Sequence, residues 1–127
     1  MKAVKVAIVA VALTSASAAV AENLVYYGET ADGAVKYYDS DTIRRLSGGY
    51  ITVWTMEDAR KDRTVRYRTG RTLWKIDCEG MMLGPMAFAN YDTNGRVLDS
   101  ESTNYPKMIP AIPGSVGYSL VEAVCAR

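Results

Sequence analysis

The segment Thr72–Cys78, TLWKIDC, has the alternating pattern of a β-strand with one buried face. Trp74 and Ile76 fall on the same face as Cys78, while the opposite face is largely charged. We therefore expect a strand here that ends in a cysteine pointing toward the core.

Strand-like runs separated by turn residues lie on both sides of this segment. The run Tyr50–Met56, YITVWTM, carries β-branched and aromatic residues on both faces, as a central strand does. The Asn-Gly in Asp92-Thr93-Asn94-Gly95 is typical of a hairpin. The other expected strands are Leu24–Tyr27, Ala34–Asp39, Val65–Thr69, Met86–Tyr91 and Arg96–Ser102.

The period of the sequence changes after Pro113-Gly114. Ser115 is a suitable N-cap for a helix over Val116–Cys125, and the apolar residues of that helix form one continuous arc. The arc consists of Val116, Tyr118, Leu120, Val121, Val124 and Cys125. Several strands followed by one terminal helix indicate an α+β fold.

The first 21 residues have the composition of an export signal. Lys2 and Lys5 precede an eight-residue apolar run, and Ala19-Val20-Ala21 has the small-x-small pattern of a cleavage site. We expect cleavage before Glu22, which leaves residues 22–127 as a single domain. The apolar run is too short to span a bilayer. A buried N-terminal strand or helix is the alternative.

Cys78 and Cys125 are the only cysteines. In an exported chain of this size an even count indicates a disulfide. Two unpaired buried cysteines are the alternative. A bridge would tie the C-terminal helix onto the sheet, because both cysteines fall on apolar faces.

Neither a metal nor a cofactor is expected. Two cysteines without any histidine do not supply a usual zinc site. Asp39-Ser40-Asp41 lacks the other ligands and the glycine of a calcium loop, so Asp41 is expected to cap a turn before Thr42–Leu46.

Charge and composition disfavour two functional classes. The chain has 15 basic and 14 acidic residues, and loss of Lys2 and Lys5 leaves a net charge of −1. This balance disfavours a globally cationic nucleic-acid binder. The absence of histidine removes the commonest general base, and no pair among the 14 acids stands out. We therefore expect a protein that is not an enzyme.

One stretch is strongly basic, with six cations opposed by Asp62 alone. They are Arg60, Lys61, Arg63, Arg66, Arg68 and Arg71. Arg66 and Arg68 alternate with apolar or aromatic residues, so we expect both to project from one face of a strand. Arginine suits bidentate capture of carboxylate, sulfate or phosphate. These residues are the candidate contact for an anionic partner, such as a glycosaminoglycan, a lipid headgroup or an acidic protein. A solvated edge strand is the alternative.

Tyrosine is abundant, with nine against one phenylalanine. The pairs Tyr26-Tyr27 and Tyr37-Tyr38 each place one ring on either face of a strand. Exposed tyrosines suit protein or glycan contacts. The alternative is that these rings only fill the core and cover the sheet.

Taken in order, several short motifs resemble the surface-adhesin protein E family of Gram-negative bacteria. They are Tyr37-Tyr38-Asp39, Ile43-Arg44-Arg45, Ile51-Thr52-Val53-Trp54, Tyr67-Arg68-Thr69, Asp77-Cys78 and Pro113-Gly114-Ser115 before Cys125. The resemblance implies an antiparallel sheet of about six strands, with the C-terminal helix held on one face by the disulfide.

The resemblance also implies a function. It implies an exported, non-enzymatic binding domain that contacts a host matrix or serum protein, or another macromolecule. The alternative is a periplasmic accessory or structural envelope protein without a host ligand. In either case the mature chain is expected to be exported, to the periplasm or the outer cell surface, and not to span a membrane.

Overall fold

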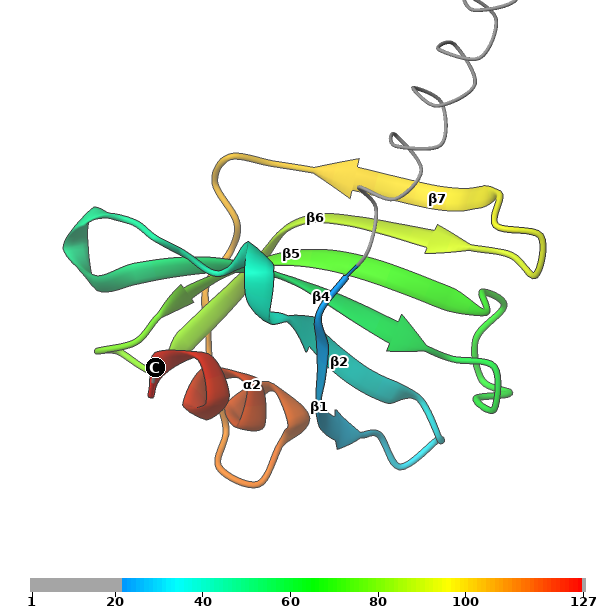
Figure 1. The fold of residues 1–127 in the computed structure, drawn as a ribbon, viewed down its shortest axis with the longest axis horizontal. Helices are drawn as coiled ribbons and strands as arrows, with labels where there is room; N and C mark the ends of the chain where they lie inside the picture. Colours follow the sequence, from blue (N-terminus) through cyan, green and yellow to red (C-terminus); the bar gives the residue numbers. More distant parts are fainter. Residues whose placement is uncertain (1–21, 127) are drawn as a thin grey trace, which may run out of the picture.

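Residues 22–126 form one antiparallel sheet with a helix on one face in this computed structural model (Figure 1). The expected export signal lies outside these described residues. Within residues 22–126, no helix has both the length and the apolarity that a membrane-crossing helix needs.

Six long strands make up the main sheet, in the order β1-β2-β4-β5-β6-β7. They are β1 (Leu24–Glu29), β2 (Val35–Asp39), β4 (Tyr50–Asp58), β5 (Thr69–Asp77), β6 (Met82–Tyr91) and β7 (Val97–Ser102). Two short strands complete it, since β3 (Arg44–Arg45) pairs with β4 and β8 (Ile109–Pro110) pairs with β6. The expected sheet of about six strands is thus confirmed, with two short additions.

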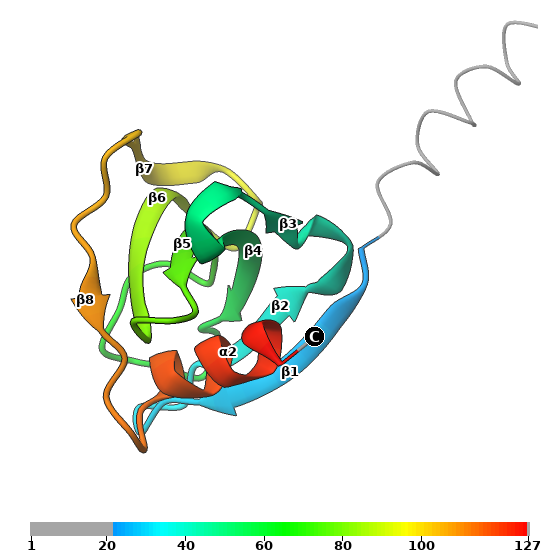
Figure 2. The ribbon, with the colours of Figure 1, turned by 90° about the vertical axis from the view of Figure 1, so that its left-hand side faces the viewer.

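The helix α2 (Val116–Cys125) begins where the sequence predicted. The Ser115 side chain accepts a hydrogen bond from the backbone N–H of Tyr118, as an N-cap does. α2 contacts both β1 and β6, although three strands separate these two in the sheet. The sheet therefore curls around the helix, and this curvature is visible in Figure 2.

The core lies between α2 and the sheet face that it covers. Along β4, Ile51 and Val53 are fully buried and alternate with half-buried residues. The predicted apolar arc of the helix supplies three of its residues to this core. The cluster consists of Tyr38, Ile51, Val53, Ile76, Leu83, Ala111, Leu120, Val121 and Val124. Trp74 joins its edge and donates its indole N–H to Thr55 Oγ1 at 3.0 Å.

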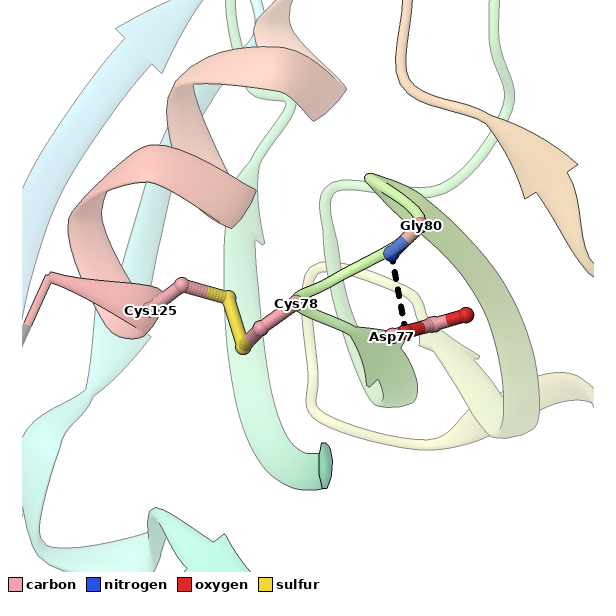
Figure 3. The surroundings of a disulfide bond; sticks show 4 residues. All are labelled: Asp77, Cys78, Gly80 and Cys125. Atoms are coloured by element: carbon pink, nitrogen blue, oxygen red, sulfur yellow. Dashed lines mark hydrogen bonds between the residues drawn. A yellow bond between two sulfur atoms is a disulfide. The ribbon is translucent and has the colours of Figure 1, made fainter. Parts of the chain in front are cut away.

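A disulfide joins Cys78 to Cys125, which confirms the predicted pairing. Cys78 directly follows β5, and Cys125 is the last residue of α2. Figure 3 shows the bridge running from the helix to the turn after β5, where the Asp77 carboxylate accepts a hydrogen bond from the N–H of Gly80 at 3.0 Å. The bridge therefore holds the end of the helix on the sheet.

Close backbone packing holds the segment before β8 against β6. A Cβ at Gly84 would lie 2.6 Å from the carbonyl oxygen of Lys107, which is closer than real Cβ atoms come to a backbone oxygen. Only glycine fits at this position without displacing that segment.

Two local predictions are wrong. Val65–Arg68 is part of a loop, and β5 begins at Thr69. The turn at Ser40–Thr42, a 3₁₀ helix (η1), is capped by Asp39 and not by Asp41, because the Asp39 carboxylate accepts from the N–H of Asp41. A second 3₁₀ helix, η2 (Ser47–Gly49), precedes β4. The hairpin prediction for Asn94-Gly95 is confirmed, and Gly95 has a φ of 81° in that turn.

Candidate binding surface

Three chain connections meet at one end of the sheet. Strand register places Val35, Asp58, Thr69 and Tyr91 in one row across β2, β4, β5 and β6. The β1–β2 turn, the β4–β5 loop (residues 59–68) and the β6–β7 turn therefore all leave the sheet beyond this row, at the right in Figure 1. We call this end the loop end and residues 59–68 the basic loop.

The basic loop is held by a buried carboxylate. Asp62 is 5% exposed, and its Oδ1 accepts hydrogen bonds from the N–H of Thr64 at 2.8 Å and from its hydroxyl at 2.6 Å. These bonds lower the pKa of Asp62. The backbone closes the turn as well, since the N–H of Asp62 donates to the carbonyl of Ala59 at 3.0 Å. The loop thus has a fixed conformation without strand pairing.

Arg68 is a structural residue of this loop. Its guanidinium donates to the carbonyl oxygens of Val65 at 2.9 Å and of Arg60 at 3.3 Å. Its backbone N–H donates to Tyr91 on β6. The guanidinium satisfies these carbonyls in place of the ladder bonds of a strand, which is consistent with the absence of strand pairing over Val65–Tyr67.

Tyr67 fixes the loop from the other side. Its hydroxyl donates to Glu57 Oε1 at 3.1 Å, and Glu57 also pairs with Lys36 at 3.3 Å. Burial, together with the nearby Glu57 carboxylate, raises the pKa of Tyr67 to about 12. Tyr67 therefore stays neutral and acts as a donor at physiological pH.

The remaining cations of the basic loop point to solvent. Arg60, Lys61, Arg63 and Arg66 are all exposed. Within residues 22–126, the side chains of Lys61, Arg63 and Arg66 make no ion pair or hydrogen bond. Four of the six predicted binding residues are thus gathered on one ordered loop and available to a partner.

Arg60 is the only exposed cation of this loop, within the described residues, that has a fixed orientation. Its Nε and Nη2 donate to the two oxygens of Asp58 at 2.9 and 2.7 Å. This hydrogen-bonded pair raises the pKa of Arg60 and lowers the pKa of Asp58. The Arg60 side chain is still 72% exposed, so its free N–H groups face solvent.

Arg71 lies apart from the basic loop. It is on β5, which is a central strand and not the edge strand considered from sequence. Its guanidinium makes a bidentate ion pair with Glu22, at the start of the described chain. This pair raises the pKa of Arg71. Arg71 therefore holds the N-terminal segment, and the structure does not place it with the exposed cations.

Two hollows adjoin the pair formed by Asp58 and Arg60, which line both of them. The larger hollow, of about 540 Å³, extends toward the β6–β7 turn and is also lined by Arg68 and Asp92. The second, of about 510 Å³, extends toward β2 and is also lined by Tyr37 and Lys61. The sequence suggested tyrosines and cations as separate features, and it did not reveal that Tyr37 meets the basic loop here.

Acid is expected to loosen this loop through Asp62. A carboxyl with a lowered folded-state pKa stabilises the fold above its unfolded pKa of about 3.9, and that contribution is lost as the pH falls through the folded-state pKa. Urea midpoints at pH 7 and pH 3 should therefore differ less for Asp62→Asn than for the wild type. The same replacement at exposed Asp32 is the control. An equal acid sensitivity in wild type and Asp62→Asn would contradict this role of Asp62.

Comparison with known proteins identifies the family of this domain. The family model of surface-adhesin protein E matches residues 24–126. Among curated proteins, no relative matches this sequence.

Solved structures of Haemophilus influenzae protein E share the fold. Crystal form II has a TM-score of 0.59 at 14% identity, covering 84% of this chain and 90% of that chain. A second structure has a TM-score of 0.58 at 16% identity, covering 84% and 86%. Protein E from a non-typeable strain gives a TM-score of 0.54 at 13% identity, with 84% and 78% covered. The match over residues 24–126 places this chain in the surface-adhesin protein E family, to which it belongs.

Proposed function

We propose that this chain is an exported surface adhesin that holds an anionic macromolecular partner at its loop end. One observation carries the proposal: Arg60, Lys61, Arg63 and Arg66 are exposed together on one ordered loop. The chain without its first 21 residues has a net charge of −1. The basic loop is net positive, whereas the rest of the domain is net negative. Attraction of an anion is therefore local to the basic loop.

Order in the loop matters for such a contact. Asp62, Tyr67 and Arg68 are held by hydrogen bonds inside the loop or to the sheet, so the exposed cations stand on a fixed backbone. The loop then loses less conformational entropy on binding than a mobile loop would. Arginine side chains in such a position are suited to carboxylate, sulfate or phosphate groups.

The location proposed is the outer cell surface, following cleavage before Glu22. The family membership supports export of the chain. Intact-mass analysis of the exported protein checks the cleavage, and protease digestion of whole cells checks the location. Digestion only after the outer membrane is permeabilised would instead favour the periplasmic accessory role.

Removing two of the exposed cations should weaken polyanion binding. We expect Arg63→Gln with Arg66→Gln to lower the affinity for an immobilised sulfated polyanion about tenfold at low salt. The effect should shrink as salt is added, because exposed charges are screened beyond about 8 Å at physiological ionic strength. Surface plasmon resonance over a salt series measures both quantities.

A matched control removes two cations elsewhere. Arg44→Gln with Lys107→Gln takes the same charge from two exposed residues outside the basic loop. We expect this variant to bind nearly as the wild type does. Equal losses of polyanion affinity in the two double variants would mean that net charge alone decides binding. The proposed role of the basic loop would then be wrong.

A further inference from the structure

We propose that the hollow between Tyr37 and the pair Arg60 and Lys61 is a subsite for one acidic sugar ring of a sulfated polysaccharide. This inference rests on the proposed function and names the class of its partner. The hollow has a volume of about 510 Å³, within the range of about 300–1,000 Å³ that small-ligand sites occupy. Besides these three residues, Gly33, Val35 and Asp58 line it.

An aromatic wall is the first requirement of a sugar subsite. Tyr37 lines the hollow from β2, and its ring forms a T-shaped pair with the ring of Tyr26, with centroids 6.2 Å apart. Tyr26 is on β1, next to Tyr37 across the strand pair, and it is 59% exposed. The contact with Tyr26 holds the Tyr37 ring in place, and Tyr26 extends the aromatic surface beyond the hollow.

An oriented cation is the second requirement. Asp58 accepts from the Arg60 backbone N–H at 3.1 Å as well as from its guanidinium, so Arg60 is fixed at the wall of the hollow. Two of its five guanidinium N–H groups are used in this pair, and three remain for an anion. Lys61 also lines the hollow and adds a second positive charge. Sulfate is well matched to this donor set.

The combination favours a sugar over an acidic peptide. A sugar ring presents a flat apolar C–H face to an aromatic ring, hydroxyls to an acceptor and sulfates to cations. The hollow offers all three, because Asp58 provides carboxylate oxygens beside Tyr37 and Arg60. An acidic peptide has no such ring face for Tyr37, so it would leave the aromatic wall of the hollow unused.

Calorimetric titration with a fully sulfated heparin tetrasaccharide tests the inference. We expect Arg60→Gln with Lys61→Gln to weaken binding about tenfold or more, since both cations that contact the sulfate would be lost. Tyr37→Leu should weaken binding about threefold to tenfold, as loss of ring stacking does. Tyr37→Phe should bind like the wild type, because it keeps the ring. The double variant Arg44→Gln with Lys107→Gln controls for net charge.

Other outcomes would overturn the inference. Wild-type affinity in Tyr37→Leu would show that the ring does not contact the sugar. Failure of the wild type to bind the tetrasaccharide would also overturn the inference. Tighter binding of polyglutamate than of the tetrasaccharide would identify an acidic peptide as the partner. In each case, a salt-dependent loss of polyanion affinity in Arg63→Gln with Arg66→Gln would still support the proposed function. Failure of the sugar subsite can therefore be distinguished from failure of the proposed function. Thermal unfolding of each variant verifies that the fold is intact.

Discussion

Replacing Cys78 and Cys125 together with serine is expected to lower the free energy of unfolding by about 2–5 kcal/mol. The bridge closes a loop between residues 47 positions apart, for which chain entropy gives about 4 kcal/mol. α2 has only ten residues and contains Gly117, so it depends on tertiary contacts for its stability. Urea unfolding of the wild type and the double variant measures the loss.

Two further observations separate the bridge from other effects. Reduction of the wild type without mutation should produce a similar loss of stability. Amide exchange in the variant should be fastest in α2, because the bridge holds the last residue of that helix. Unchanged protection of α2 would contradict the role assigned to the disulfide.

Truncation of Leu120 to alanine is expected to cost about 2–5 kcal/mol of unfolding free energy. Leu120 is 1% exposed and packs in the core between α2 and the sheet. Its removal leaves a cavity that the strands cannot fill, since the sheet is fixed by its hydrogen-bond ladders. The same urea experiment measures the effect.

The control for Leu120 lies on the same helix. Glu122 is exposed, so Glu122→Ala should change stability by less than about 0.5 kcal/mol. A cost below about 1 kcal/mol for Leu120→Ala would mean that α2 is not a main part of the core.

The fold could be predicted from sequence where a residue pattern is compatible with only one type of secondary structure. Strict alternation in Thr72–Cys78 and the apolar arc of Val116–Cys125 put both cysteines on apolar faces, and the structure has them bonded there. The hairpin at Asn94-Gly95 was predictable because few sequences accept the positive φ of that turn.

The basic loop was mispredicted because side-chain bonds replaced a strand ladder. Val65–Thr69 alternates like a strand, and alternation alone does not reveal that Arg68 will donate to carbonyls within its own loop. For the same reason Arg68 is a poor probe of binding. Its replacement would disturb the loop itself, whereas Arg63 and Arg66 are exposed.

The convergence at the hollow could not be derived from spacing. Tyr37 and Arg60 are distant in sequence, and register between β2 and β4 brings them together by pairing Val35 with Asp58. Strand order and register depend on the whole sheet, so no local pattern predicts this meeting. Arg71 shows the opposite case. It lies near the loop cations in sequence and was therefore grouped with them, but in the structure it lies on β5 and pairs with Glu22.

Amide chemical-shift mapping tests the central claim most directly. Isotope-labelled mature protein titrated with the heparin tetrasaccharide should show its largest shifts in residues 58–66, followed by residues 33–37. Shifts confined to α2 or β7, with the basic loop unchanged, would contradict the claim that this adhesin domain binds an anionic partner at its loop end.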